Sequence, residues 1–201
     1  MASFSTWSIS DQMVTAKGAK MATITAGGER VFTPTAVPLK MPFGGPGNFD
    51  KTPAVCQNLD FRATPELFEY FTALDTWMKD YLMCHSERIF KKQLSVEEIN
   101  SGYHPCISQR GTYEPTFRTK VNLHEKGVTF WDSDGKIRGP PDNWIGLPAI
   151  PQLHVSHVWI VGREFGLVLT CTDLQLYDAE PRVCPFARTR SFVQNEGEMP
   201  Q

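Results

Sequence analysis

The sequence lacks the features that mark membrane and secreted proteins. No run of apolar residues approaches the about 18 residues that a membrane-spanning helix needs. The first residues, Met1–Thr6, have neither a basic region nor an apolar core, so we expect no signal peptide. The Asn-x-Ser/Thr acceptor for glycosylation does not occur. These absences predict an intracellular protein that does not bind membranes.

Cysteine is scarce and scattered. The sequence has no CxxC pair, and its cysteines are odd in number: Cys56, Cys84, Cys106, Cys171 and Cys184. This pattern is typical of a reduced, intracellular protein rather than a disulfide framework.

An excess of positive charge is also missing. Lys and Arg number 20 against 22 Asp and Glu, which gives a formal net charge of -2. This excludes a protein that binds nucleic acid through overall positive charge, but it permits a local basic groove on a neutral body. The 41% hydrophobic and 21% charged residues are ordinary for a globular protein. The length predicts one domain, over residues 1–180, followed by a flexible tail over 181–201.

Signatures of catalysis are absent as well. Gly44-Gly45-Pro46-Gly47 matches neither GxxxxGK[ST] nor GxGxxG, and we interpret it as a turn. The nucleophile motif GxSxG does not occur, and Cys171 in an apolar strand is expected to be a structural thiol. We therefore expect neither an enzyme nor a cofactor.

The first half of the chain is predicted to contain strands, a loop and then two helices. Residues 4–36 have the pattern of strands, with a hairpin around Gly27-Gly28, and residues 34–53 have the prolines and glycines of a loop. Thr64 suits an N-cap, and the apolar spacing after it predicts a helix to about Cys84. A capping box predicts a short second helix over 95–102, so the helical insertion covers about residues 64–102.

Strands dominate the second half. Residues 116–123 alternate between a basic face, with Arg118 and Lys120, and an apolar face, with Phe117, Val121 and Leu123. Further strands are expected over 128–131 and 136–138, a loop with Trp144 over 139–151, and a central hairpin over 153–161 and 167–177. The order of strands, helices and strands predicts a mainly β fold, a barrel or a sandwich with inserted helices.

Histidine and cysteine offer two candidate metal sites. Cys84, His85, His104 and Cys106 could converge at the helix ends, and zinc accepts such ligands. His154 and His157 are expected on opposite sides of a strand, which argues against metal there.

Basic residues mixed with aromatic residues are concentrated between residues 110 and 144. Proteins that bind single strands without sequence preference need cations along the phosphates and aromatic faces for the bases. The candidates in this region are Arg110, Tyr113, Phe117, Arg118, Lys120, Lys126, Phe130, Trp131, Lys136, Arg138 and Trp144. The alternative interpretation is a solvated strand face beside aromatic residues of the core.

A series of local patterns then runs in order along residues 20–178. It consists of Thr33-Pro34, Pro42-Phe43-Gly44, Leu74-Asp75, His85-Ser86-Glu87, Phe90-Lys91-Lys92, Ser95-x-Glu97-x-Ile99, Tyr103-x-Pro105, Tyr113-x-Pro115-Thr116-x-Arg118-x-Lys120-Val121, Trp159 before Phe165-Gly166, and Gln175. In this order the series resembles the single-stranded DNA-binding proteins of large eukaryotic DNA viruses. That family is distantly similar to phage single-stranded DNA-binding proteins with an OB-fold.

The resemblance implies an OB-fold-like barrel with one long and one short inserted helix. It also implies sequence-independent binding of single-stranded DNA in replication, recombination or repair, in the nucleus or at a viral replication site. Arg118 and Lys120 would match the basic strand, and Lys91 and Lys92 the basic end of the helical segment. Many family members end in a strongly acidic tail that recruits partners, whereas Asn195–Gln201 is only weakly acidic. RNA, replication proteins and a second copy of the chain stay open as partners.

On this hypothesis Trp131, Trp144 and Tyr113 are the stacking platforms, and Lys126, Lys136 and Arg138 line the phosphate path. Trp159 is expected in the core. Two alternatives remain. The first is a β-sandwich assembly subunit, such as a capsid protein, and the second is a small zinc-dependent hydrolase or deaminase that uses the Cys84, His85, His104 and Cys106 set.

Overall fold

The computed structural model describes residues 4–16, 18–43, 56–123 and 127–178. These residues form a mainly β structure with a helical segment inserted between its strands, as the sequence predicts. The helices are α1 (Pro65–Phe90) and α2 (Val96–Gly102). The strands are β1 (Trp7–Ile9), β2 (Met13–Val14), β3 (Lys20–Ala26), β4 (Leu39–Lys40), β5 (Cys56–Arg62), β6 (Tyr103–His104), β7 (Ile107–Ser108), β8 (Thr116–Asn122), β9 (Thr129–Trp131), β10 (Ile137–Arg138), β11 (Pro148–Val161) and β12 (Glu164–Leu176). The predicted Gly44–Gly47 turn and the 181–201 tail lie outside the described residues.

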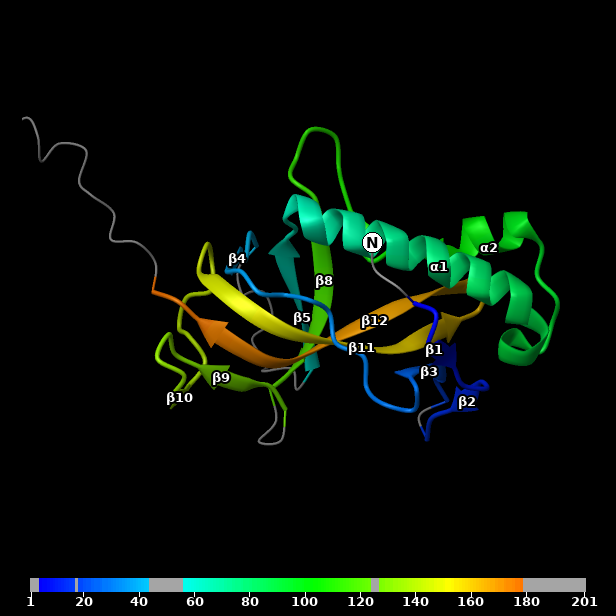
Figure 1. Cartoon of the computed structure of the whole chain (residues 1–201), viewed down its shortest axis with the longest axis horizontal. Coiled ribbons are helices and arrows are strands. Elements are labelled where there is room, and N and C mark those ends of the chain that lie inside the picture. The colour runs from blue at the N-terminus through cyan, green and yellow to red at the C-terminus, as the bar shows by residue number, and fades with distance from the viewer. Residues whose placement is uncertain (1–3, 17, 44–55, 124–126, 179–201) are drawn as a thin grey trace, which may run out of the picture.

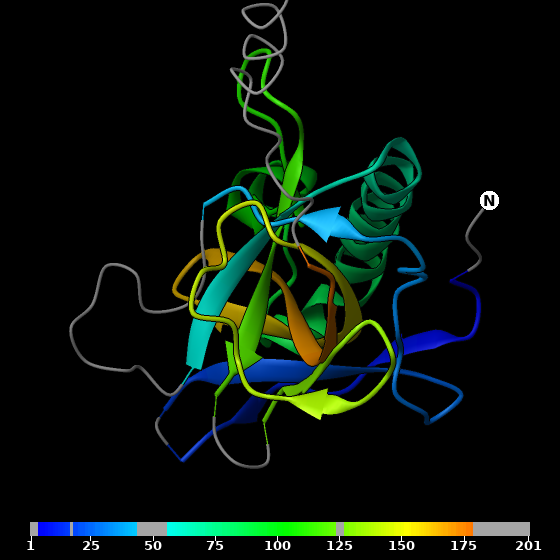
Figure 2. The ribbon, with the colours of Figure 1, turned by 90° about the vertical axis from the view of Figure 1, so that its left-hand side faces the viewer.

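The hairpin of β11 and β12 lies at the centre of the sheet, whose main strand order is β1-β3-β11-β12-β8-β5 (Figure 1). β11 pairs with β3 and β4, and β12 pairs in parallel with β6, β8 and β9. The predicted central hairpin is therefore confirmed, although β11 begins at Pro148, inside the expected loop. Figure 2 shows the strands curving around a common centre, with α1 outside them.

The predicted turn at Gly27-Gly28 is present, but the hairpin is not. Ala26 and Glu29 exchange two backbone hydrogen bonds of 3.0 Å each, and both glycines have the positive φ that this turn requires. After the turn the chain leaves β3, so that Thr33 N–H donates to the Leu153 carbonyl at 2.9 Å. The segment after the turn therefore lies against β11 instead of β3.

Helix α1 begins where the sequence indicates and ends later. The Thr64 hydroxyl accepts from Leu67 N–H at 3.3 Å, which supplies the N-cap. The helix departs from helical geometry at His85, next to the predicted end at Cys84, and then continues to Phe90. Lys91 closes it in the left-handed conformation, with φ 60°. In α2 the predicted capping box of Ser95 and Glu98 is present.

One hydrophobic core joins α1 to the barrel. Phe71 of α1 packs on Phe117 of β8, with ring centroids 4.9 Å apart, and Phe117 stacks on Phe61 of β5 at 5.6 Å. Phe90, at the other end of α1, packs on Phe165 of β12 at 4.9 Å. The long helix is therefore held against the sheet at both ends. Neither α1 nor α2 is long and apolar enough to cross a membrane.

The sequence did not predict β5, which lies beside β8 at one edge of the main strand order. Its inward residues Leu59 and Phe61 are fully buried. Leu123 was expected to share the apolar face of Phe117 and Val121, but it lies past the end of β8 and is exposed.

Candidate nucleic-acid interface

The outer face of β8 carries the basic residues that the alternation predicts. Arg118 and Lys120 are exposed, whereas Phe117, Thr119 and Val121 are buried on the inner face. Thr119 donates its hydroxyl to the Leu169 carbonyl at 3.0 Å, which satisfies the one polar side chain among these inward residues.

Arg118 is engaged by the neighbouring strand. Its Nε lies 2.8 Å from Oδ1 of Asp60 and its Nη2 lies 3.0 Å from Oδ2, a two-point contact that raises the pKa of Arg118. Lys120, by contrast, forms no ion pair within the part of the chain that the structure describes. Lys120 is therefore the better placed of the two to meet an added anion.

Two histidines extend this face across β12 onto β11. Lys120 pairs in register with Thr170, and Thr170 pairs with His154. A β-bulge between Val155 and His157 changes the alternation, because Val155 and Val158 are both buried. His154 and His157 consequently share the outer face, and the expectation that they lie on opposite sides of the strand is wrong.

The surroundings disfavour the charged form of both imidazoles. Burial, followed by the charges of Lys120 and His154, lowers the pKa of His157 to about 4. Burial and then the charge of Arg30 lower the pKa of His154. A neutral imidazole can still donate one hydrogen bond to a phosphate oxygen, whereas the positive charge beside these histidines comes from Lys120.

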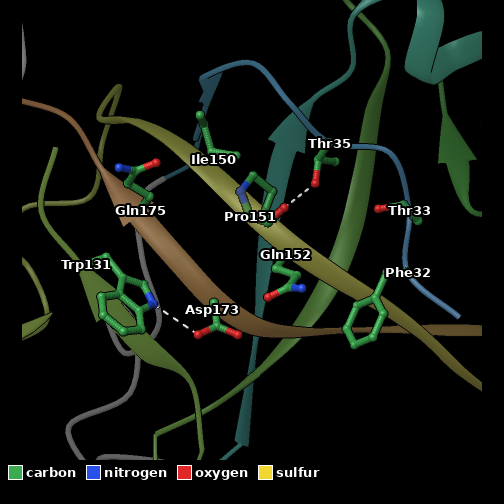
Figure 3. A pocket seen from close by; sticks show the side chains of 9 residues that line it. All are labelled: Phe32, Thr33, Thr35, Trp131, Ile150, Pro151, Gln152, Asp173 and Gln175. Atoms are coloured by element: carbon green, nitrogen blue, oxygen red, sulfur yellow. Dashed lines mark hydrogen bonds between the residues drawn. The ribbon is translucent and has the colours of Figure 1, made fainter. Parts of the chain in front are cut away.

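A hollow of about 320 Å³ is lined by residues of β9, β11, β12 and the segment around Phe32 (Figure 3). Phe32, which is 41% exposed, forms one wall and packs on His154 with ring centroids 5.6 Å apart. Trp131 of β9 forms the opposite wall and donates its Nε1–H to Asp173 Oδ1 at 3.0 Å. The full lining is Phe32, Thr33, Thr35, Trp131, Ile150, Pro151, Gln152, Asp173 and Gln175.

The structure does not gather the other sequence-predicted residues into one groove. Lys91 and Lys92 lie at the end of α1, where Lys92 pairs with Glu98 at 2.6 Å. Arg110 and Tyr113 lie on the loop before β8, and Tyr113 is 78% exposed. Lys136 and Arg138 lie exposed at the β9–β10 hairpin, at the opposite end of the molecule from the end of α1 (Figure 1). Lys126 is outside the described residues.

Two tryptophan predictions need correction. Trp144 is only 5% exposed and packs edge-on against Phe130 at 5.7 Å, so it belongs to the core and offers no stacking face. Trp159, expected in the core, is half-buried on the outer face and packs on His104 at 5.4 Å.

The proposed zinc ligands do not form a cluster. Cys84 and His85 are exposed on α1. Nε2 of His104 lies 3.5 Å from Oε2 of Glu164. Burial, followed by the nearby Asp75, raises the pKa of the Cys106 thiol. Among the described residues no group of three or more His, Cys, Asp or Glu is placed to hold a metal ion.

Sequence reasoning missed most of the hollow. Phe32, Gln152 and Asp173 were not singled out, and His154 and His157 were weighed only as metal ligands. One signal for Phe32 was present in the sequence. In an extended segment Phe32 faces the opposite side from its neighbours Val31 and Thr33, so its aromatic ring is directed away from the side that those two residues share.

No protein-family model matches the chain, and no curated protein matches its sequence. Among solved structures, it is similar to gp2.5, a single-stranded DNA-binding protein encoded by bacteriophage T7. The two share 12% identity with a TM-score of 0.51, over 86% of this chain and 100% of gp2.5. A single-stranded DNA-binding protein from bacteriophage Enc34 gives 7% identity and a TM-score of 0.44, over 90% of this chain and 99% of that one.

The likeness to gp2.5 concerns the fold. A mainly β structure with two helices, one of them long, matches this phage OB-fold protein, and the predicted fold class is confirmed. The β-sandwich is thereby set aside as the fold.

Proposed function

We propose that this chain binds single-stranded DNA along the outer face of β8, β12 and β11, without requiring a defined sequence. The observation that carries the proposal is the exposed Lys120, which forms no ion pair with any residue that the structure describes, on a face that continues to His154 and the exposed Phe32. Cations for phosphates and an aromatic face for a base are what such binding needs. The fold shared with gp2.5 supports the same assignment.

The role of the protein follows from the resemblance in its sequence. We place it with the single-stranded DNA-binding proteins of large eukaryotic DNA viruses, acting in replication, recombination or repair and carrying no catalytic activity. Residues 1–180 would form one domain, with the helical segment as an insertion. Arg118, Lys120 and Trp131 lie on or beside the proposed DNA path, and Arg110, Tyr113, Lys136 and Arg138 would extend it.

The test is a fluorescence-anisotropy titration of a labelled dT oligonucleotide at two salt concentrations, with duplex DNA as competitor. Binding should be selective for the single strand, should weaken as salt rises, and should quench tryptophan fluorescence, because counterions are released and bases stack. A lack of binding at low salt would overturn the proposal. RNA of the same length, used as a second competitor, decides between the two nucleic acids.

A further inference from the structure

The hollow beside the DNA path has a carboxylate where a phosphate site would have a cation. Asp173 lines it, and no Lys or Arg is among its lining residues. Within the described ranges Asp173 forms no ion pair. A phosphate would be repelled there, whereas a group that presents N–H donors would be held.

The walls of the hollow fit a flat ring. Phe32 and Trp131 stand on opposite sides of it, with Gln152 and Asp173 between them (Figure 3). Its volume of about 320 Å³ lies within the range of ligand pockets, roughly 300–1,000 Å³. Unstacked bases are held in proteins by aromatic side chains and by hydrogen bonds to their edges.

The polar side chains that line the hollow can form further hydrogen bonds. Trp131 occupies one position on Asp173 Oδ1, and a carboxylate has about four acceptor positions. The Gln152 amide makes no side-chain hydrogen bond to any residue that the structure describes, so its donors and its acceptor remain available. Thr33 is 7% exposed, and its hydroxyl is buried without a partner in the described ranges. An unsatisfied hydroxyl in the wall of a hollow is an independent sign that the protein alone does not complete this site.

We infer that this hollow is a subsite for one unstacked base and that Asp173 makes it prefer guanine over thymine. Guanine presents two adjacent donors, N1–H and the 2-amino group, to a carboxylate, and its O6 accepts from an amide such as that of Gln152. Thymine presents a single N–H between two carbonyl oxygens, which the carboxylate repels. Adenine and cytosine each present one amino group beside a ring nitrogen that accepts and does not donate.

The subsite rests on the proposed binding of single-stranded DNA and adds a base preference to it. Lys120 pairs with Thr170, Thr170 pairs with His154, and the His154 ring contacts Phe32. A strand that follows the basic face therefore passes the mouth of the hollow. Backbone binding stays tolerant of sequence, while one nucleotide in each bound segment is selected.

Three labelled oligonucleotides test the inference: all dT, dT with one central dG, and dT with one central deoxyinosine. Anisotropy titrations at one salt concentration should show that the guanine strand binds about five- to a hundredfold more tightly than all dT. The inosine strand should fall between them, because inosine keeps N1–H and lacks only the 2-amino group. Wild-type protein alone suffices for this comparison.

Asp173→Asn removes the charge and keeps an oxygen that can accept from Trp131. It should abolish the guanine preference without weakening binding to all dT, because the lost charge repels both phosphate and the thymine carbonyl oxygens. Asp134→Asn, an exposed change of equal charge in the β9–β10 turn, is the matched control and should retain the preference. A guanine preference that survives in Asp173→Asn would overturn the role of Asp173.

The two proposals fail in different ways. If wild-type protein binds none of the three strands, the proposed function is wrong and the subsite falls with it. If it binds all three equally well, the proposed function stands and the base subsite is overturned.

Discussion

Arg118 and Asp60 face each other across β8 and β5, with Nε 2.8 Å from Oδ1 and Nη2 3.0 Å from Oδ2. A phosphate that approaches Arg118 must compete with a carboxylate that already occupies two of its donors. The neighbouring Lys120 faces Asn58 in the same register and forms no ion pair with a carboxylate in the described part of the chain. Two cations that look equivalent in the sequence therefore differ in what they can offer a ligand.

This difference predicts unequal effects on DNA binding. Lys120→Ala should weaken binding to a dT oligonucleotide and reduce the slope of log K against log salt by about 0.7, the value for one lost phosphate contact on a single strand. Arg118→Ala should have a smaller effect on both quantities. Asp60→Asn should strengthen binding, because it frees Arg118. Anisotropy titrations at several salt concentrations measure all three, and equal losses for the two alanine variants would contradict the prediction.

Phe32 is predicted to stack on a base. Phe32→Ala should weaken binding to dT by about 1–3 kcal/mol, the usual effect of removing one stacking ring. Phe32→Tyr should bind normally, since it keeps the aromatic face. The control is Trp144→Phe, which changes a buried ring and should leave the affinity unchanged once folding is verified by circular dichroism. A loss of affinity in the folded Trp144→Phe variant would contradict the assignment of Trp144 to the core rather than to the DNA-binding face.

His157 should make stability depend on pH. Its pKa is lowered to about 4 in the folded protein, against an ordinary value of 6.5. Between these values the unfolded chain binds a proton that the folded chain does not, so this contribution to stability is complete above about pH 6.5 and is lost as the pH falls toward 4. Urea unfolding at pH 7.5, 6 and 5 should show a smaller decline for His157→Gln than for the wild type. Parallel declines would refute the role of His157.

Tyr103 is predicted to stabilise the contact between α1 and β6. Its hydroxyl donates to Asp75 Oδ1 at 2.6 Å, and Asp75 is 6% exposed. Burial, opposed by this hydrogen bond, raises the pKa of Asp75. Tyr103→Phe leaves the carboxyl with one partner fewer and should lower the free energy of unfolding by about 1–3 kcal/mol in urea titrations. Tyr113→Phe, at a highly exposed tyrosine, is the matched control and should show no change.

The features that the sequence predicted well depend on residues close together in the chain. Thr64 and Leu67 form an N-cap within one turn, and Ser95 and Glu98 form a capping box over the same distance. The alternation in β8 likewise follows from the two-residue period of a strand. Residues this close together in the chain determine the local backbone geometry by themselves. The helical insertion and the basic face of β8 could therefore both be predicted.

The β-bulge in β11 shows where that reasoning stops. Strict alternation assigns His154 and His157 to opposite faces, and one extra residue between Val155 and Val158 brings them together. The bulge depends on how β11 fits β12 and β3, which no local pattern records.

The hollow could not be predicted for a related reason. Phe32, Trp131 and Asp173 come from three distant segments, and only the tertiary fold brings them together. Trp144 was misjudged because its proline-rich surroundings are typical of an exposed loop, whereas Phe130 and the core bury its ring.

The position of β11 and β12 in the chain has a consequence for synthesis on the ribosome. The strands at the centre of the sheet emerge after all the others, so β3 and β8, which the β11–β12 hairpin later joins, leave the exit tunnel with one edge still unpaired. Until the last hairpin is made, the nascent chain carries unpaired strand edges of the kind that aggregate. The hairpin therefore joins the β1–β3 and β5–β8 pairs in one late step, and a nascent chain that stops before Pro148 lacks the two strands that connect these pairs.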